Sequence, residues 1–384
     1  MREGFIPLSV PEIRGKEWKY IKECLDTNWV SSVGPFVDRF ERIVADYIGT
    51  KYAVATVNGT AALHIALMVA GIQREEEVLV STLSFISPAN TIRYVGAWPV
   101  FMDAEPDYWQ LDTQKLTDFL NKECQWRDGA LYNKTTGRRV KAILPVHILG
   151  HPVDMDSVLE MAEKYNLTVI EDATESLGAK YKGRMVGHLS HISCLSFNGN
   201  KLITTGGGGM ILTDNEDWAR KAKYLTTQAN DNPAEYIHNE IGYNYRLSNI
   251  QAAMGCAQME NIDDYIAAKR NIAANYTGAL CKTPGITPMQ EAPWAYSIFW
   301  LYTIMVKENE YGENSRELRT RLAEAQVQSR PLWQPLHRAP AHAGSQSYFC
   351  EVADMLNRRG LCLPSSVGLA AESQEKVIQL IKKE

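Results

Sequence analysis

The chain has 384 residues, 45% of them hydrophobic and 22% charged, which are ordinary values for a globular protein. Its formal net charge of −5 is spread along the sequence, so no clustered basic face indicates nucleic-acid binding. No stretch approaches the roughly 18 apolar residues of a membrane span, and the N-terminus lacks the apolar run of a signal peptide. The seven cysteines are far apart, without a C-x-x-C pair or other metal-ligand spacing. We therefore expect a cytoplasmic protein that binds no membrane, nucleic acid or metal.

The middle of the chain alternates short β-rich runs with helical stretches. Helices are predicted over 61–70 and 155–165, the first ended by Gly71. The segment Gln125–Lys141 has turn residues and five cations, and we predict an exposed hairpin there. Most predicted strands are continuous apolar runs, which is typical of a mostly parallel sheet covered on both faces. These strands are Val78–Ser81, Pro99–Asp103, Ala142–Val146, Thr168–Glu171, Ile192–Phe197 and Met210–Thr213.

The last third of the chain has a different composition. Ser248 and Gln251 form an S-x-x-Q capping box, which predicts the start of a long helix. Beyond about residue 275 prolines come in two clusters. We predict a large α/β domain over 25–270 and a smaller α/β domain over 271–384, completed by residues 1–24.

The first candidate site follows a short β run at 52–57. Asn58 and Gly59 end this run, and an apolar helix begins directly after them. The N-terminus of a helix offers unpaired N–H groups and a positive dipole end, which suit a phosphate, and Thr60 adds a hydroxyl. Taken alone, the segment is more simply a strand–turn–helix with an ordinary cap.

The second candidate site is a pair of acids, Glu171 and Asp172, directly after apolar β residues. In α/β sheets, ligands bind at the carboxyl ends of the strands. A carboxylate at such a position can pair with a protonated ring nitrogen of a cofactor. The alternative is a solvated acid at the end of a strand.

The third candidate site is a lysine that follows a strand and precedes four glycines. Ser196 ends the strand, Lys201 lies in the loop, and the glycines occupy 206–209. A lysine that forms a Schiff base must be partly desolvated, and glycines let the backbone approach a flat cofactor. The lysine precedes the glycines, so the spacing is not that of a Walker A loop. Alone, this pattern is a surface lysine beside a flexible turn; after the other two signals, it favours a cofactor held covalently on Lys201.

These motifs resemble the DegT/DnrJ/EryC1/StrS family of pyridoxal 5′-phosphate (PLP)-dependent sugar aminotransferases, from Ile6–Ser9 to Pro331–His337. The resemblance implies an aspartate-aminotransferase-like large domain (PLP fold type I) and a homodimer with shared active sites. It also implies a covalent and catalytic role for Lys201. The implied cofactor contacts are Asp172 for the pyridinium nitrogen, the Thr60 and Ala61 amides and the Ser196 hydroxyl for the phosphate, Phe85 for stacking, and Asn244 for the phosphate of the other subunit.

Two positions differ from, or vary within, the family pattern, and a third matters for the reaction. Glu175 stands where relatives often have Gln or His; a carboxylate near the phenolate side of the cofactor would need a proton or a cation partner. Gly207 stands where a Glu is frequent. Some relatives replace the lysine with histidine and are dehydratases, a branch that Lys201 disfavours.

The resemblance further implies transfer of an amino group from L-glutamate to C4 of a nucleotide-linked 4-keto-6-deoxy sugar for a surface glycan. The 125–141 insertion is similar to the subgroup making legionaminic acid or bacillosamine precursors, which favours a UDP-linked 4-keto-6-deoxy-N-acetylhexosamine. The alternatives are a GDP-linked 4-keto-6-deoxymannose, giving perosamine, and a PLP-dependent sugar dehydratase. Candidate sugar-nucleotide contacts are Trp29, Ser31, Arg246 and His337. Each also has a purely structural interpretation, as a core, cap or loop residue.

Overall fold

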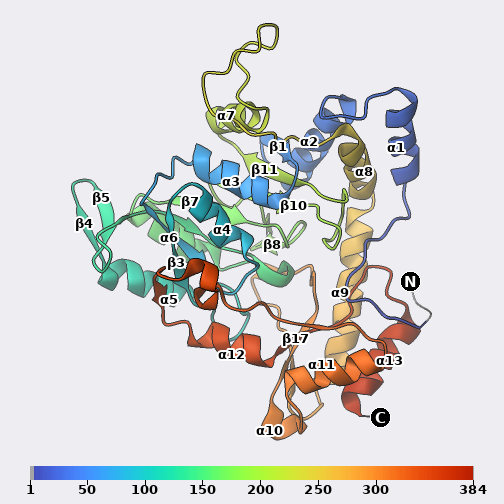
Figure 1. The fold of residues 1–384 in the computed structure, drawn as a ribbon. Helices are drawn as coiled ribbons and strands as arrows, with labels where there is room; N and C mark the ends of the chain where they lie inside the picture. Colours follow the sequence, from blue (N-terminus) through green and yellow to red (C-terminus); the bar gives the residue numbers. More distant parts are fainter. Residues whose placement is uncertain (1–3, 384) are drawn as a thin grey trace.

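A large, mostly parallel sheet and a smaller sheet are joined by a long helix in the computed structural model, which describes residues 4–383 (Figure 1). The strand order of the large sheet is β1-β11-β10-β7-β6-β2-β3-β16, and β11 is antiparallel to both of its neighbours. The six strands expected from the sequence are all present. The bounds are β1 (Tyr52–Thr56), β2 (Glu77–Ser81), β3 (Trp98–Met102), β6 (Arg139–Leu144), β7 (Thr168–Asp172), β10 (Ile192–Ser196), β11 (Gly209–Thr213) and β16 (Ser347–Tyr348).

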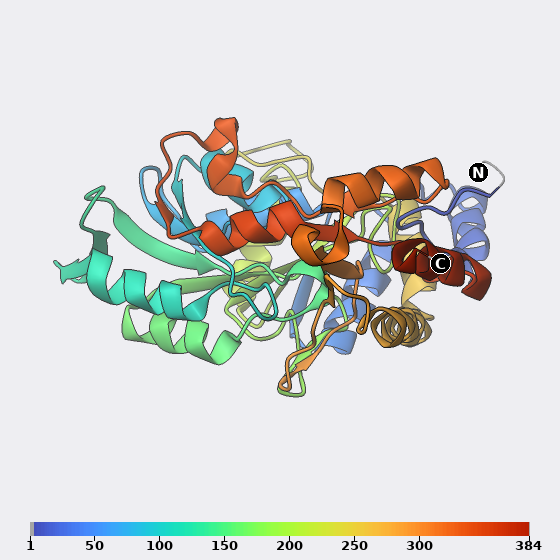
Figure 2. The same cartoon turned by 90° about the horizontal axis from the view of Figure 1, so that it is seen from below.

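Helices cover both faces of the large sheet, which explains its continuous apolar strands. All five residues of β2 and of β11 are buried. Helix α3 packs against β10 and β11, whereas α6 packs against β6 and β7. Figure 2 shows α5 and α6 side by side on one face. The helices of this region are α3 (Gly59–Val69), α4 (Ser87–Tyr94), α5 (Thr113–Asp118), α6 (Met155–Lys164) and α7 (Glu216–Thr226).

A group of helices leads from the large sheet to the small one. Helices α1 (Glu17–Asp26) and α2 (Pro35–Ile48) both pack on α8 (Asn249–Met259). The predicted Ser248–Gln251 capping box is present at the start of α8. The predicted long helix is two helices, because Asn261 has a non-helical ψ of 10° before α9 (Ile262–Leu280) begins. Helix α9 runs through the predicted domain boundary at residue 270, and the division into two domains stays a prediction.

The small sheet has the strand order β12-β14-β17-β15. Its antiparallel strands are β12 (Ile286–Pro288), β14 (Thr303–Val306), β17 (Gly360–Cys362) and β15 (Arg330–Pro331), and its helices are α10 (Glu308–Tyr311), α11 (Ser315–Glu324), α12 (Glu351–Arg359) and α13 (Ala371–Lys382). The N-terminal segment lies against this region, since Ile6 pairs with Val327. A third sheet joins β13 (Ala295–Tyr296), β8 (Lys180–Tyr181) and β9 (Arg184–Met185).

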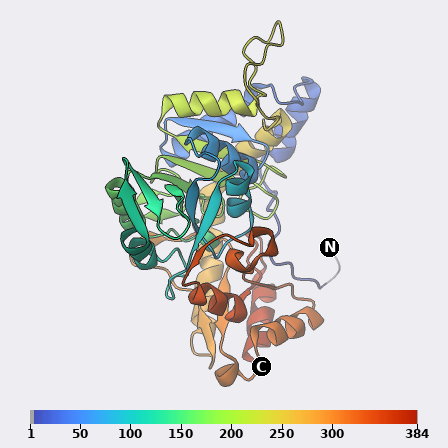
Figure 3. The same cartoon turned by 60° about the vertical axis from the view of Figure 1, so that its left-hand side comes forward.

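The predicted insertion is a hairpin that projects from the large sheet (Figure 3). Strands β4 (Cys124–Arg127) and β5 (Ala130–Asn133) pair antiparallel, and β5 then pairs with β6. The tip is Asp128–Gly129, with φ of 50° and 73°, as a tight two-residue hairpin turn requires. The turn residues expected at 133–137 form the second bend instead, between β5 and β6.

Neither a membrane-spanning helix nor a disulfide is found in the described part of the chain. Among residues 4–383, no helix has the length and apolarity needed to cross a membrane. All seven cysteines lie in this part of the chain as free thiols; six are buried, and Cys281 is exposed.

Candidate active site

A cavity of about 610 Å³ lies where the carboxyl ends of the large-sheet strands face the small sheet. One wall comes from the ends of β7 and β10, from the loop after β2, and from the starts of α3 and α4. The opposite wall comes from the N-terminal segment, Trp300, and the residues around β15 and β17. The cavity therefore has two walls, a large-sheet wall and a small-sheet wall.

The start of α3 forms one end of the large-sheet wall. The Asn58 side chain caps the helix by accepting the Ala61 N–H at 2.8 Å. Within residues 4–383, the N–H groups of Gly59 and Thr60 have no acceptor, so both are available to an anion. A Cβ on Gly59 would lie 3.0 Å from the Cβ of Ser196, which explains the glycine. Of the two predicted phosphate amides, that of Thr60 is available and that of Ala61 is used by the cap.

The glycines at 206–209, which the sequence analysis expected beside the cofactor, lie elsewhere. None of residues 206–209 lines the cavity. The run turns back onto the strand, with Phe197 N–H donating to the Gly208 carbonyl at 2.9 Å. A Cβ on Gly209 would lie 2.5 Å from the carbonyl oxygen of Asn58. These glycines therefore let β11 pack closely on the Asn58 turn, and they do not line the cavity.

The two acids at the end of β7 face opposite ways, as successive residues of a strand do. Glu171 is fully buried and accepts from His147 Nε2 at 3.1 Å and from the Leu189 N–H at 3.2 Å. His147 accepts the Val153 N–H at 2.9 Å on Nδ1, so its proton is on Nε2. Glu171 is thus a structural acceptor beneath the cavity, and Asp172 alone faces the cavity.

Asp172 is a buried carboxylate that lines the cavity, and it is 2% exposed. Its Oδ1 accepts the Thr174 N–H at 3.1 Å, and no cation among residues 4–383 forms an ion pair with it. Burial raises the pKa of Asp172, because the charged form is poorly solvated there. A buried carboxylate without a cation partner is costly unless a ligand supplies the cation. The site therefore fits a ligand with a protonated ring nitrogen.

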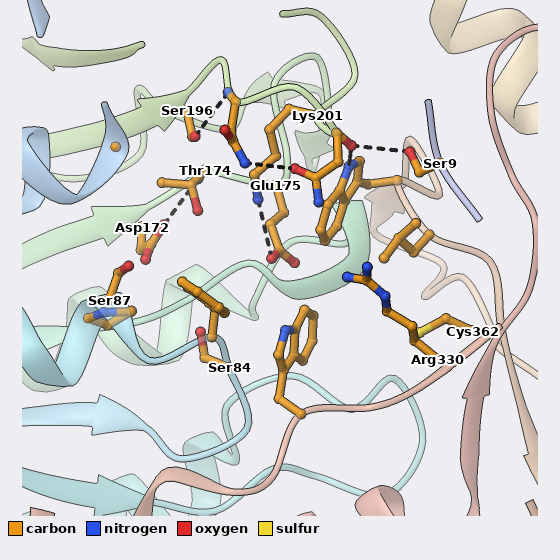
Figure 4. A pocket seen from close by; sticks show the side chains of 18 of the residues that line it. Ser9, Ser84, Ser87, Asp172, Thr174, Glu175, Ser196, Lys201, Arg330 and Cys362 are labelled. Atoms are coloured by element: carbon orange, nitrogen blue, oxygen red, sulfur yellow. Dashed lines mark hydrogen bonds and ion pairs between the residues drawn. The ribbon is translucent and has the colours of Figure 1, made fainter. Parts of the chain in front are cut away.

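Lys201 reaches the centre of the cavity from the loop after β10 (Figure 4). Its Nζ lies 3.4 Å from Glu175 Oε1 and 4.0 Å from the centroid of the Trp300 ring. Glu175 accepts the Leu149 N–H at 2.9 Å on its other oxygen, and burial raises its pKa. The Lys201 side chain is 14% exposed, which matches the partial desolvation expected of a Schiff-base lysine. The cation partner that Glu175 requires is Lys201.

The other predicted residues divide into two groups. Phe85 and Ser196 line the cavity, and the Phe85 ring is 56% exposed. The second group lies outside the lining. The Trp29 and Ser31 carbonyls accept from Asn249, Arg246 pairs with Thr56 of β1, Asn244 is exposed beside Thr227, and His337 Nδ1 lies 2.8 Å from Thr82 Oγ1.

Sequence reasoning did not predict the small-sheet wall. Its polar and aromatic residues are Trp300, Gln328, Arg330 and Trp333. None of them comes directly after a strand that the sequence predicts. They reach the cavity because segments far apart in the sequence pack together. The available signal was the Arg330–Pro331 pair in the proline-rich segment that carries the family resemblance.

An unpaired buried carboxylate, a partly desolvated lysine and free amides at a helix N-terminus define a PLP-dependent enzyme. The model of the DegT/DnrJ/EryC1/StrS aminotransferase family matches residues 11–382, and the chain belongs to this family.

Named relatives agree with this assignment. The chain is 38% identical to "GDP-perosamine synthase" of Caulobacter vibrioides over 97% of its length and 96% of the relative. It is also 38% identical to "GDP-perosamine synthase" of Escherichia coli O157:H7, with 98% and 96% covered. Among solved structures, S. venezuelae DesV aligns with a TM-score of 0.86 at 28% identity, covering 96% of this chain and 94% of that one. The protein is thus a PLP-dependent sugar aminotransferase, and the predicted fold class and cofactor are confirmed.

Proposed function

We propose that this enzyme moves the amino group of L-glutamate to C4 of a GDP-linked 4-keto-6-deoxymannose, giving GDP-perosamine. Two relatives that match over nearly the full length of both chains carry the name GDP-perosamine synthase. The cavity supports the reaction type, because Asp172, Lys201 and the α3 N-terminus converge on it.

The sequence-based preference for a UDP-linked N-acetylhexosamine is not confirmed. It relied on the β4–β5 hairpin, which projects from the large sheet and contributes no residue to the cavity. The relatives favour the GDP-linked alternative instead of a bacillosamine or legionaminic acid precursor. Position 201 holds lysine, so the dehydratase reading gains no support.

The large-sheet wall would hold the cofactor. The amides of Gly59 and Thr60 and the hydroxyl of Ser196 would bind its phosphate, and Phe85 would cover its ring. Asp172 would keep a proton on the ring nitrogen, because a buried carboxylate favours a cation beside it. Bound PLP supplies a carbonyl carbon that exchanges amines and an electron-withdrawing ring that stabilises negative charge on the substrate carbon.

Lys201 and Glu175 would together serve the transfer of the proton that the donor carbon loses. The amine of Lys201 would take the proton from the donor α-carbon and deliver it to the cofactor in the first half-reaction, and it would make the reverse transfer, to C4 of the sugar, in the second. Glu175 is fixed by the Leu149 N–H and holds the Lys201 Nζ at 3.4 Å, so it sets where that amine rests. The ring of Trp300 covers the same amine and limits its contact with water.

We also propose that two copies of this chain form a homodimer. The segment 231–241 projects from the body (Figure 1), and it exposes Tyr236 (79%) and Ile241 (83%). Exposed apolar side chains on one projecting segment are typical of a surface that another chain covers. Asn244 and Arg246 lie just after this segment, beside Thr227 and Thr56, so a dimer contact there would place them near the second copy of the chain.

The test of the proposed function is a substrate panel. Purified PLP-loaded enzyme is incubated with L-glutamate and GDP-, UDP- or dTDP-linked 4-keto-6-deoxy sugars, and products are identified by mass spectrometry. We expect the highest kcat/KM with the GDP-linked sugar, a stable 4-amino product, and one 2-oxoglutarate per amino sugar. A higher kcat/KM with a UDP-linked N-acetylhexosamine, or release of ammonia with a deoxygenated product, would contradict the proposal. The Lys201→Ala variant is the control for background exchange.

A further inference from the structure

The backbone carbonyl of Asn200, the residue before Lys201, accepts two side-chain hydrogen bonds. Trp300 Nε1 donates to it at 2.7 Å, and Ser9 Oγ donates to it at 3.2 Å. A carbonyl oxygen has two lone pairs, so these two donors use its full capacity. Figure 4 shows both hydrogen bonds as dashed lines that meet at one oxygen beside Lys201. Ser9, Trp300 and the Asn200 carbonyl form the Asn200 clamp.

The Ser9 donor is held by the backbone on both sides of it. The Leu8 carbonyl accepts the Ser365 N–H at 2.9 Å, and the Val10 N–H donates to the Ser366 hydroxyl at 3.0 Å. The N-terminal segment is thus tied to the chain that follows β17, and Ser9 lies between the two ties. Its hydroxyl therefore reaches the clamp from a fixed backbone.

The Trp300 donor is tied to the segment that also holds Glu175. The Trp300 N–H donates to the Leu149 carbonyl at 2.9 Å, and the Leu149 N–H donates to Glu175 Oε2 at 2.9 Å. The Trp300 ring centroid lies 4.0 Å from the Lys201 Nζ. One indole therefore acts on both ends of Lys201, because its N–H fixes the backbone and its ring contacts the amine.

The clamp fixes the peptide unit from which the Lys201 side chain starts. The Asn200 carbonyl and the Lys201 N–H belong to one rigid planar unit. At the other side of this plane the Lys201 N–H donates to the Asn198 carbonyl at 3.0 Å. Three hydrogen bonds thus hold a single peptide unit. A lysine side chain is long and flexible, so the position of its amine depends on a fixed base.

We propose that Ser9 and Trp300 are positioning residues, which place the Lys201 amine through the Asn200 carbonyl. The proposal rests on the proposed role of Lys201 and adds two residues that act on its backbone. The amine must meet the reacting carbon in both half-reactions, and a misplacement of about 1 Å can cost about a hundredfold in rate. Both donors come from the small-sheet wall, so the clamp ties the two walls together at the catalytic lysine.

The test uses variants that remove one donor at a time. Ser9→Ala removes the hydroxyl, and Ser9→Thr keeps it. Trp300→Phe removes the indole N–H but leaves an aromatic ring beside the amine. Two matched controls remove similar hydrogen bonds outside the cavity: Ser190→Ala, from a hydroxyl to the Ile192 carbonyl at 3.0 Å, and Trp98→Phe, from an indole N–H to a carboxylate at 3.0 Å.

Two properties of each variant are measured. Hydrogen exchange of the Lys201 N–H is followed by mass spectrometry in the cofactor-free protein. The maximum rate and the half-saturating L-glutamate concentration of the first half-reaction are followed by cofactor absorbance of the PLP-loaded enzyme, without any sugar. The first property reports the peptide unit that the clamp holds, and the second reports the amine that the unit carries.

We expect exchange at Lys201 to become about threefold faster in Ser9→Ala and about tenfold faster in Trp300→Phe, as the net worth of one hydrogen bond implies. The maximum rate of the glutamate step should fall by similar factors, while the half-saturating glutamate concentration changes less than about twofold. Ser9→Thr and both controls should match the wild type.

Unchanged exchange at Lys201 in both variants, or equally faster exchange throughout α9 and the small sheet, would overturn the proposal. So would faster exchange at Lys201 with an unchanged glutamate step. A higher half-saturating glutamate concentration at an unchanged maximum rate would make Ser9 and Trp300 substrate contacts instead of positioning residues. If the wild type completes the glutamate step but aminates no GDP-linked sugar, the proposed acceptor fails while the result for the clamp still stands.

Discussion

The two walls of the cavity are built in different ways. On the large-sheet wall, each functional residue follows a buried strand or begins a helix, so a short local motif fixes its position. On the small-sheet wall, Trp300, Arg330 and Trp333 come from segments without such motifs, and the packing of the small sheet brings them to the cavity. The first wall presents an unpaired carboxylate and free amides, and the second presents the Arg330 guanidinium.

This difference suggests that the two walls bind different chemical groups. The large-sheet wall matches the fixed features of a cofactor, which are a phosphate and a ring nitrogen. The small-sheet wall would match the parts of substrates that vary between enzymes of the family. Substitutions on the first wall should therefore impair every substrate alike, and those on the second, apart from Ser9 and Trp300, should discriminate between substrates.

The largest effect is expected at Lys201. The Lys201→Ala variant lacks the amine that is placed to move the proton, so kcat should fall at least about a thousandfold with every donor and acceptor. Steady-state kinetics with glutamate and the preferred sugar measure this. Retention of more than a tenth of the wild-type rate would contradict the role of Lys201.

Asp172→Asn should have the next largest effect. The amide can still accept the Thr174 N–H, but it carries no charge to hold a proton on the ring nitrogen. We expect kcat to fall about a hundredfold, similar to the loss of one preorganised electrostatic contact elsewhere. The same factor with two different amino donors would support a role at the cofactor; a loss confined to one donor would argue against it.

Glu175→Gln should change the pH dependence more than the maximum rate. Burial raises the pKa of Glu175, so the wild-type carboxylate gains its proton above the ordinary value of 4.5 and loses its contact with Lys201 as the pH falls. The wild-type kcat/KM should therefore decline on the acid side, and the glutamine variant should lack this decline while its maximum falls roughly tenfold. Identical acid limbs in the two pH profiles would disprove the role of Glu175.

Lys269 connects the small-sheet wall to α9, and here the expected effect is on stability. Its Nζ donates to the Trp300 carbonyl at 2.7 Å and to the Ser365 carbonyl. Burial lowers the pKa of Lys269 to about 7 from 10.5. Between these values the unfolded chain binds a proton that the folded chain does not, so the free energy of unfolding rises with pH, by up to about 1.4 kcal/mol per pH unit.

The Lys269→Met variant should lose that rise while its kcat stays within a few-fold of the wild type. Denaturant unfolding at several pH values between 7 and 10 measures the slope. Lys376→Met, an exposed lysine on α13, is the control and should keep the wild-type slope. Equal slopes in the wild type and Lys269→Met would contradict the assignment.

The comparison of the walls also explains which site residues could be predicted from the sequence and which could not. Strand ends are visible as apolar runs that stop at polar residues, so Thr60, Asp172, Ser196 and Lys201 were predicted and all line the cavity. The function of the glycine run was misread, because its close contact is with the Asn58 backbone and depends on how β11 packs. Arg330 was missed because its one local mark, the adjoining Pro331, does not show that the packing of the small sheet brings it to the cavity. Asn244 stays a prediction that depends on a second copy of the chain, and Trp29, Ser31, Arg246 and His337 stay predictions for the sugar nucleotide.

The central claim is that the amine of residue 201 is the one that carries the cofactor. The measurement is reduction of the PLP-loaded enzyme with borohydride, followed by proteolysis and mass mapping of the modified peptide. A single pyridoxyl adduct on the peptide that contains Lys201 is the predicted result. An adduct on another lysine, or no adduct on an enzyme that still turns over, would contradict it.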